Sequence, residues 1–336
     1  MKKIGIIGAG ASGLYAAINL KNENTDVYIL EKNKTIGKKL LITGNSRCNI
    51  TNAAYYEDFL ERVISNKKFL YSSFNNHDNY ATMDFFEKKG LDLVICEANR
   101  VFPKSQSSKD VVRFFERKII EEDIKLITDT EVIDIKKDHK FRVKTKNRNY
   151  DFDYLIIATG GLSYPNTGSS GDGYKFAKNF GHKITKTYPS LVPIFFKDKD
   201  LDEVKALSFD NVTINAISGG KKYSQSGPIL LTKNFVSGPA ALSLSSFLVD
   251  KKIDDLYLNL SEFCKTDLDL KLIDLFAKNP NKDISNTLST FFPITLINII
   301  LRRSGIGLSK KTNQITKEER NYLIENIKKF NIDFDR

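Results

Sequence analysis

The first thirty residues of the chain constrain its fold more than any other stretch. Lys3 to Glu31 reads KIGIIGAGASGLYAAINLKNENTDVYILE. An apolar run from Ile4 to Ile7 enters a glycine cluster, an apolar-periodic segment follows, and a second apolar run ends at Glu31. This order predicts a strand, a tight turn, a helix, a second strand and an acid, which together form the nucleotide-binding βαβ unit.

The glycines of the cluster have separate expected tasks. Gly8 permits the sharp turn from strand to helix, Gly10 lets a pyrophosphate approach the backbone, and Gly13 lets the helix pack closely on the strand. The following helix would present free N–H groups and a partial positive charge to phosphates.

Glu31 lies 23 positions after Gly8 (31 − 8), where a carboxylate accepts hydrogen bonds from ribose hydroxyls. A carboxylate there repels a 2′-phosphate, so we expect FAD or NAD rather than NADP. The alternative is a glycine-rich βα turn that binds nothing.

Composition narrows the class of protein. A chain of 336 residues is long enough for two or three domains. The net charge of +11 is spread over scattered, mostly lysine residues with no RNA-binding motif, so nucleic-acid binding is not favoured. The three cysteines and three histidines are scattered, so we expect neither a disulfide framework nor a protein metal site. The longest apolar stretch, Phe291 to Leu301, is too short to span a bilayer, and we expect a cytoplasmic protein.

Two further stretches have the composition expected of ligand-binding loops. Residues 32–52 are expected to form a long basic loop in which Lys38, Lys39 and Arg47 close over a diphosphate and a flavin edge, with a solvated surface loop as the alternative. Residues 154–161 read as a buried strand running into glycines beside the first strand, and a second glycine-rich loop, 163–173, opens onto a helix. A plain surface turn is the alternative for that loop.

The remaining periodicities predict ordinary elements. Helical spacing over 55–90 predicts core positions at Phe59, Val63, Phe69, Leu70 and Phe74. An amphipathic helix is expected over 107–120 with Ser107 or Ser108 as its cap, and a hairpin over 131–136 and 140–146. From position 189 onward we expect short strands of a separate sheet, and then helices over 268–278, 284–288, 293–302 and 317–329.

Several motifs together resemble one family. GKKLLITGNSRCNITN at 37–52, RVFP at 100–103, ATGGLSYPNTGSSGDGYKFAKNFG at 158–181 and residues 228–239 are similar to those of the HI0933-like flavoproteins, also described as BaiN-like or aminoacetone-oxidase-like FAD-binding enzymes. The resemblance runs along essentially the whole chain. It implies an α/β fold: a Rossmann-type FAD-binding domain at 1–188, an inserted β-barrel-like domain at 189–262 and 305–336, and a small helical domain at 263–304.

The resemblance also implies non-covalent FAD and a set of binding positions. In chain order, the residues expected at the pyrophosphate and the ribose come first. The residues expected near the phosphates or the flavin follow, and a stretch expected beside the cofactor comes last. The expected cofactor-binding residues are Gly8, Gly10, Ala11, Ser12, Gly13, Glu31, Lys32, Lys39, Arg47, Cys48, Asn49, Ala158, Thr159, Gly160 and Gly161.

The chain departs from the family pattern in three places. Asn45 and Ser46 stand where the family has glycines (SGGGRCN), and Lys233 and its neighbours stand where it commonly has FTHxGxSGP. Family members also continue with a GGxxxxE strand, a GLYFAGE-like strand and a GGYNLQ-like loop, none of which occurs here. The chain is therefore expected to lack the family's C-terminal segment and one wall of the flavin site.

The function implied is an FAD-dependent oxidoreductase that moves a hydride between flavin and a small organic substrate, with NADH or NADPH as a transient donor. Arg47, Tyr164 and Lys233 are the candidates for catalysis, and packing is favoured over catalysis for Cys48. A degenerate flavin-binding protein without activity and an RNA-acting flavoprotein stay open as alternatives, as does the oligomeric state.

Overall fold

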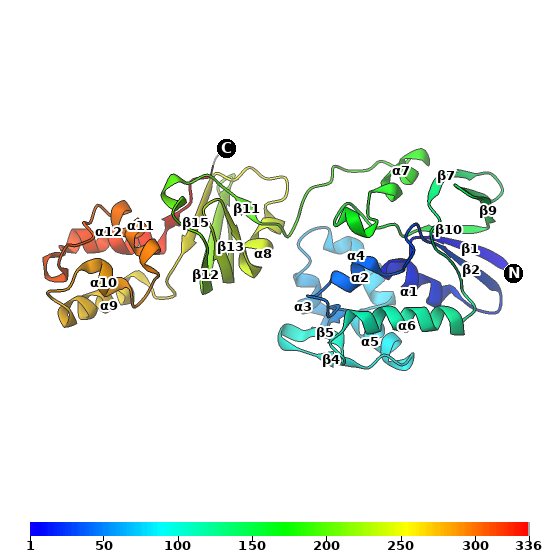
Figure 1. Cartoon of the computed structure of the whole chain (residues 1–336), viewed down its shortest axis with the longest axis horizontal. Helices are drawn as coiled ribbons and strands as arrows, with labels where there is room; N and C mark the ends of the chain where they lie inside the picture. The colour runs from blue at the N-terminus through cyan, green and yellow to red at the C-terminus, as the bar shows by residue number, and fades with distance from the viewer. Residues whose placement is uncertain (335–336) are drawn as a thin grey trace. The chain divides into compact units, whose positions relative to one another are not determined.

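The computed structural model describes residues 1–334 and divides the chain into two units (Figure 1). The first unit is Met1–Thr185 and the second begins at Lys186. Positions 335 and 336, the end of the expected β-rich segment 305–336, lie outside the described residues.

The first unit begins with the expected βαβ arrangement. In chain order its helices and strands are β1 (Lys2–Ile7), α1 (Ala11–Leu20), β2 (Thr25–Leu30), α2 (Lys38–Ile42), β3 (Thr51–Asn52), α3 (Tyr56–Glu61), α4 (Lys67–Asn76), α5 (Asn79–Lys88), β4 (Leu93–Ile95), β5 (Arg100–Pro103), α6 (Ser108–Glu121), β6 (Lys125–Ile127), β7 (Val132–Lys137), β8 (Phe141–Thr145), β9 (Asn149–Phe152), β10 (Tyr154–Ile157) and α7 (Asp172–Asn179).

A four-stranded parallel sheet in the order β10-β1-β2-β6 forms the centre of this unit. Ile6 of β1 pairs with Ile156 of β10 on one side and with Ile29 of β2 on the other. The strand before the second glycine-rich loop therefore lies beside the first strand, as the sequence predicts. The expectation that this strand is buried was wrong, because β10 is at the edge of the sheet and has no buried residue. Both glycine turns consequently leave the sheet at the same carboxyl edge, which is where ligands bind in open α/β sheets.

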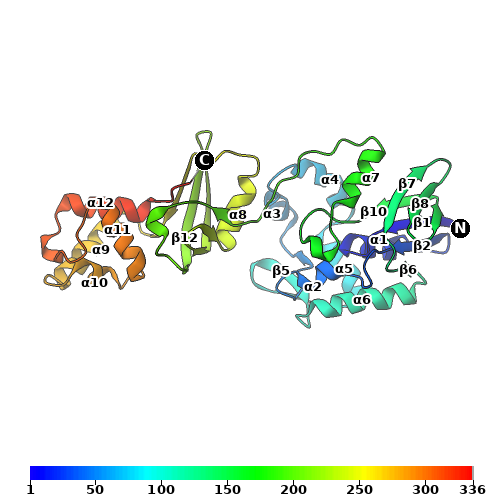
Figure 2. The same cartoon turned by 45° about the horizontal axis from the view of Figure 1, so that its top comes forward.

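The two faces of the parallel sheet are covered differently. Ile4 and Ile6 point into a core shared with α1, α5 and α6, whereas Ile7 joins a second core with β7–β9 and α7. Figures 1 and 2 show α1 and α6 on one side of the sheet and β7–β9 on the other. Gly5 makes the second layer possible, because a Cβ there would lie 2.4 Å from the Phe152 ring.

A small sheet in the order β3-β5-β4 holds the segment between α2 and β3 through hydrogen bonds to β5. The Ile50 N–H donates to the Val101 carbonyl at 2.8 Å, and the Asn49 amide, oriented to satisfy its neighbours, donates to the Thr51 and Val101 carbonyls at 2.9 and 3.1 Å. Most of residues 32–52 is irregular, but the expectation of one uninterrupted loop was wrong because α2 occupies Lys38–Ile42.

Two positions that were expected in the core of this unit are exposed. Phe69 and Leu70, both on α4, are 83% and 36% exposed, and α4 has no buried residue. Helical spacing identified a helix there without identifying a partner for its apolar side. Ser107 is the N-cap residue of α6, as expected, but its side chain makes no capping hydrogen bond. Ser108 donates from Oγ to the Leu41 carbonyl at 2.9 Å.

The second unit contains a six-stranded sheet in the order β11-β14-β13-β12-β15-β16, with every neighbouring pair antiparallel. Its helices and strands are β11 (Ile194–Phe195), β12 (Leu207–Ser218), β13 (Lys221–Leu231), β14 (Phe235–Ser237), α8 (Pro239–Phe247), β15 (Asp255–Asn259), α9 (Lys265–Lys278), α10 (Ile284–Leu288), α11 (Ile294–Arg303), α12 (Lys317–Lys328) and β16 (Phe330–Asn331).

One hydrophobic core joins the sheet of this unit to its helices. The long hairpin β12–β13 turns at Gly219 and Gly220, both at positive φ, as a two-residue loop requires. The helix α12 lies within 305–336, which the domain division assigned to the β-rich part. The α/β fold class with a Rossmann-type domain, a barrel-like sheet and helices is confirmed, while the domain boundaries stay a prediction.

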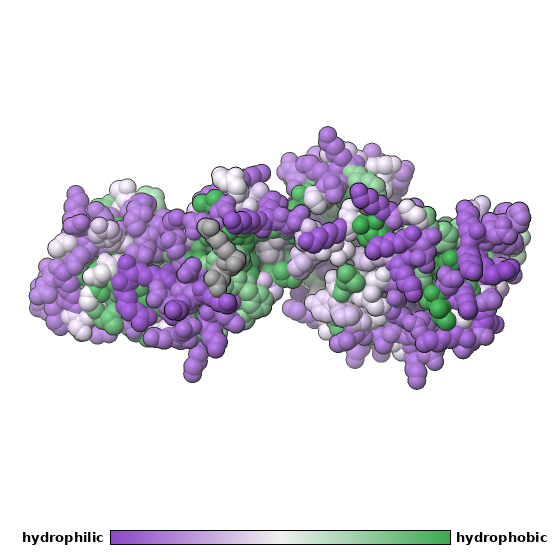
Figure 3. Space-filling model, turned by 90° about the horizontal axis from the view of Figure 1, so that it is seen from above, coloured by the Kyte–Doolittle hydropathy of each residue, from purple (hydrophilic) through white to green (hydrophobic). Residues whose placement is uncertain are grey.

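The surface is predominantly hydrophilic on the face that Figure 3 presents, and apolar residues form only small areas on either unit. Across residues 1–334, no helix combines the length and apolar character needed to cross a membrane.

Candidate functional site

The glycine turn between β1 and α1 is held in place by two close approaches. Gly8 has φ +105°, and a Cβ on it would lie 2.5 Å from the Ala158 carbonyl oxygen. A Cβ on Gly13 would lie 2.0 Å from the Gly8 carbonyl oxygen. Both positions therefore require glycine for the chain's own packing: Gly8 against the backbone that follows β10, and Gly13 against the turn itself.

Gly10 is different from these two. A Cβ built on it meets no atom within 4 Å, and its φ of −86° is one that any residue adopts. The chain itself thus gives no steric reason for glycine here. Gly10 is also the N-cap of α1 and supplies no capping side chain, so the N–H groups of the first turn have no intrahelical partner. An open backbone at a helix N-terminus is the arrangement that binds anions.

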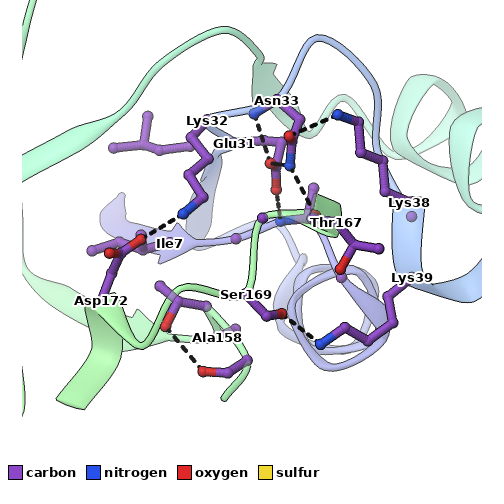
Figure 4. Close-up of a pocket in the computed structure, with 18 of the residues that line it drawn as sticks. Ile7, Glu31, Lys32, Asn33, Lys38, Lys39, Ala158, Thr167, Ser169 and Asp172 are labelled. Atoms are coloured by element: carbon purple, nitrogen blue, oxygen red, sulfur yellow. Dashed lines mark hydrogen bonds and ion pairs between the residues drawn. The ribbon is translucent and has the colours of Figure 1, made fainter. Parts of the chain in front are cut away.

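A cleft of about 320 Å³ lies over this turn, and we call it the glycine-turn cleft (Figure 4). Its wall combines the ends of β1 and β2, the start of α2, the segment 130–132 and the second glycine-rich loop. The lining residues include Gly8, Ala9, Gly10, Ala11, Ser12, Glu31, Lys32, Asn33, Lys38, Lys39, Thr43, Thr130, Ala158, Thr159, Gly160, Thr167, Ser169 and Asp172.

Glu31 fixes the floor of the cleft. Its Oε2 accepts a hydrogen bond from the Ala9 N–H at 2.7 Å, and its Oε1 accepts from the Asn33 N–H at 2.8 Å and from Asn33 Nδ2 at 2.6 Å (Figure 4). Glu31 is only 7% exposed. A carboxylate has about four acceptor positions, so three bonds leave one free for a ligand hydroxyl.

Three lysines line the cleft, and each already has a partner. Lys32 Nζ contacts Ser170 Oγ at 2.6 Å and the Asp172 carboxylate at 2.7 Å. Lys38 Nζ donates to Asn33 Oδ1 at 2.9 Å, and Lys39 Nζ donates to Ser169 Oγ at 2.6 Å. Lys32 is the one of the three whose charge is balanced by a carboxylate. The bonds of Lys32 and Lys39 connect residues 31–39 to the second glycine-rich loop across the cleft.

A second cavity of about 480 Å³, which we call the arginine cavity, adjoins the first and shares Lys39 and Thr43 with it. Its other lining residues are Ile42, Gly44, Asn45, Arg47, Asn49, Arg100, Phe102, Ser163 and Tyr164. The Arg47 guanidinium lies 4.4 Å from the centre of the Phe102 ring. Tyr164 has φ +54° and a side chain that is 66% exposed.

The structure distributes the expected site residues over several places. Ten line the glycine-turn cleft: Gly8, Gly10, Ala11, Ser12, Glu31, Lys32, Lys39, Ala158, Thr159 and Gly160. Arg47, Asn49 and Tyr164 line the arginine cavity, while Gly13 and Gly161 line neither. Lys233 lies in the second unit, in the turn between β13 and β14. Their roles stay predictions.

Cys48 also lines neither cavity. Cys48 is 3% exposed within the core of the parallel sheet, and burial raises the pKa of its thiol above the usual value. A thiol that resists ionisation is a poor nucleophile, so any contact with a ligand would come from the Cys48 backbone.

Sequence reasoning missed several lining residues. Asn33, Ser169 and Asp172 form bonds across the glycine-turn cleft, with the Asn33 amide donating to the Thr167 carbonyl at 3.3 Å. Arg100 with Phe102 forms one side of the arginine cavity. The second glycine-rich loop was a usable signal for Ser169 and Asp172. The RVFP motif marked Arg100 as part of a resemblance but gave no reason to place it beside Arg47.

Comparisons with known proteins extend over both units. The family model of the HI0933-like protein Rossmann domain matches residues 2–259, and that of the HI0933-like protein barrel and H2TH domain matches residues 188–336. The 3-dehydro-bile acid delta(4,6)-reductase of Clostridium scindens is 31% identical over 257 residues, which are 73% of this chain and 60% of that protein.

Two further relatives are ribosomal RNA dihydrouridine synthases. The Haemophilus influenzae protein is 30% identical over 72% of this chain and 60% of its own length. The Escherichia coli protein is 26% identical over 87% of this chain and 71% of its own length. The chain therefore spans 60% of the length of two of these three relatives.

Proposed function

The chain belongs to the HI0933-like protein family, and from this premise we propose that it is an FAD-dependent oxidoreductase whose glycine-turn cleft binds FAD without a covalent bond. The observation that carries the proposal is the open backbone at Gly10. No atom of the chain occupies the space over it, although the glycines on either side are fixed by close contacts. Space at the N-terminus of α1 suits a diphosphate.

The residues of the cleft have distinct tasks in this proposal. The N–H groups of the first turn of α1 hold the diphosphate, with Lys39 adding a positive charge nearby. Glu31 accepts a hydrogen bond from a ribose hydroxyl with its remaining acceptor position, and its carboxylate disfavours a 2′-phosphate. Bound FAD supplies hydride chemistry, while the protein supplies binding and orientation.

The substrate in our proposal is a small organic molecule that accepts or donates a hydride. One relative is named as a reductase of a 3-dehydro bile acid, which favours the reducing direction. NADH or NADPH would act as a transient donor, because the sequence has no second GxGxxG unit to hold a nicotinamide dinucleotide.

A second candidate function is reduction of a base in RNA. Two relatives are named as ribosomal RNA dihydrouridine synthases, and the net charge of this chain is +11. Basic charge favours binding to a phosphate backbone in a salt-dependent way. The scattered distribution of the lysines makes this the less favoured candidate.

Anaerobic flavin reduction tests the proposal. The full chain, loaded with FAD and freed of excess, is mixed with NADH or NADPH while the flavin absorbance near 450 nm is followed. We expect one of the two donors to bleach the flavin and an α,β-unsaturated carbonyl compound to restore the colour. A flavin that neither donor bleaches would refute a pyridine-nucleotide-dependent reductase. If RNA restored the colour and small enones did not, the second candidate would replace the first.

A further inference from the structure

We propose that the arginine cavity is an anion-binding subsite in which Arg47 and Arg100 hold a carboxylate or phosphate group of a small-molecule substrate. The inference rests on the proposed function, since the diphosphate of the cofactor is assigned to the adjoining glycine-turn cleft. The substrates that this subsite would bind carry an oxyanion, and Arg100 would contribute to binding them.

Strand geometry brings the two arginines to one wall. Arg100 and Phe102 are two residues apart on β5, so their side chains leave the strand on the same face. The Phe102 ring on that face lies 4.4 Å from the Arg47 guanidinium. Stacking on the ring fixes the plane of the guanidinium and leaves its N–H edge available.

Neither guanidinium is well satisfied by the protein. Arg47 donates from Nε to the Gly44 carbonyl and from Nη1 to Gln106 Oε1, both at a long 3.4 Å. Arg100 donates to the Glu97 carbonyl at 3.1 Å, and its closest approach to the Glu97 carboxylate is 4.0 Å. That carboxylate side chain is 93% exposed, so the pair contributes little. Most of the five donors on each arginine are left for a ligand.

The cavity concentrates positive charge without a balancing carboxylate. Arg47, Arg100 and Lys39 line it, and within residues 1–334 its wall includes no aspartate or glutamate. The Lys39 ammonium is paired with a neutral hydroxyl, Ser169 Oγ. Like charges in one cavity repel, and a bound anion relieves that repulsion. Guanidinium groups match carboxylate and phosphate oxygens in planar two-bond geometry.

The cofactor's diphosphate does not account for these arginines. In the proposed function it occupies the N-terminus of α1, in a cleft that neither Arg47 nor Arg100 lines. The two cavities meet at Lys39 and Thr43. An anion in the arginine cavity would therefore belong to a second molecule that lies next to the cofactor, which is the position of a substrate.

Anion titration of the FAD-loaded full chain tests the subsite. Calorimetry measures the affinity for inorganic phosphate and for acetate in wild type, Arg100→Gln and Arg100→Lys. The matched control is Arg113→Gln, which removes one charge from an exposed, ion-paired arginine on α6. Loss of one charge-assisted bond corresponds to about a 10-fold to 150-fold loss of affinity. We expect a weakening of this size for the tighter of the two anions with Arg100→Gln, a smaller one with Arg100→Lys, and no change with Arg113→Gln.

The arms of the titration separate the sources of the anion. Tighter binding of phosphate assigns a phosphorylated substrate, and tighter binding of acetate assigns a carboxylic acid. Equal weakening by Arg100→Gln and Arg113→Gln would overturn the subsite, as would a matching loss of FAD affinity in Arg100→Gln. Arg100-dependent binding of an oligouridylate without binding of either small anion would overturn the small-molecule class. Phosphate binding can be repeated without FAD, so failure of the proposed function is distinguishable from failure of this inference.

Discussion

Replacing Gly10 with alanine separates ligand binding from folding at the glycine turn. The new methyl group would meet no atom of the chain within 4 Å, and the backbone at φ −86° and ψ −174° is extended. Alanine therefore fits the folded chain without a clash. The methyl group would instead occupy space over the first turn of α1, where our account places the diphosphate.

The expected magnitudes follow from these two facts. Replacing glycine at a compatible backbone position stabilises a protein by about 0.4–1 kcal/mol through the unfolded state, and losing glycine as the N-cap offsets a similar amount. The free energy of unfolding should change by less than about 0.5 kcal/mol. Displacing the diphosphate from one backbone N–H costs about 1.5–3 kcal/mol, so FAD affinity should fall at least about 10-fold.

The assay combines a denaturant melt with an FAD titration followed by flavin fluorescence. Gly13→Ala is the matched control, because its Cβ would lie 2.0 Å from the Gly8 carbonyl oxygen. That variant should lose more than about 2 kcal/mol of stability through overpacking. If Gly10→Ala bound FAD as tightly as wild type, the diphosphate could not lie where we place it. If it unfolded like Gly13→Ala, the reasoning from open space would fail.

Three further outcomes are expected. Ser46→Gly should raise the free energy of unfolding by about 1 kcal/mol, because Ser46 has φ +62° and left-handed backbone disfavours a Cβ. Ser105→Gly, at a residue whose own φ is not positive, should lower the free energy of unfolding in the same urea melt, and equal effects would contradict the argument. Iodoacetamide at about pH 8 should label the exposed Cys264 in the native protein but Cys48 only after unfolding, because burial raises the pKa of the Cys48 thiol. Equal labelling rates of the two cysteines in mass spectrometry would refute this prediction. The hydrogen bond from the Lys310 ammonium lowers the pKa of Glu319, and a second bond from a backbone N–H at the α12 cap adds to this shift. The ionised Glu319 therefore stabilises the fold above its unfolded pKa of about 4.3, and this stabilisation is lost as pH falls through the folded pKa. Glu319→Gln should therefore be less stable than wild type at neutral pH by about 1 kcal/mol, and the difference should shrink as a series of urea melts is taken to acid pH. A difference that stays constant down to the most acid pH at which the protein folds would count against the assignment.

The sequence predicted the parallel part of the fold well because its signals are local. Apolar runs beside the glycine clusters identified β1 and β10, and the apolar run that ends at Glu31 identified β2. Small residues at 158–161 indicated that β10 lies beside β1. The expectation failed where burial depends on distant partners. Phe69 has helical spacing, yet nothing in α4 itself determines which face meets another element.

Side-chain positions at the site were harder to predict than its backbone. Glycines report the turn directly, since Gly8 and Gly13 are required by contacts under 3 Å. The pairing of Lys32 with Asp172 joins residues 140 positions apart, and no local pattern encodes it. Arg100 reaches the wall beside Arg47 only because β5 pairs with β3, which follows directly after the RCNI segment.

The loop that precedes Arg47 holds residues in a backbone conformation that glycine adopts more readily. Gly44, Asn45 and Ser46 have φ of 56°, 54° and 62° in succession. The resemblance placed glycines at the last two positions in other family members. Left-handed backbone at a residue with a Cβ costs roughly 1–2 kcal/mol, and such strain is found at functional sites. Gly44 and Asn45 line the arginine cavity, which fits that pattern.

Competition for FAD binding tests the central claim most directly. Equilibrium dialysis of the full-length chain with FAD, repeated with ADP or riboflavin in excess, asks which part of the cofactor the chain holds. Our account predicts saturable binding of one FAD per chain and displacement by ADP, which carries the diphosphate and ribose, but not by riboflavin, which carries neither. Displacement by riboflavin and not by ADP, or no saturable FAD binding, would contradict it.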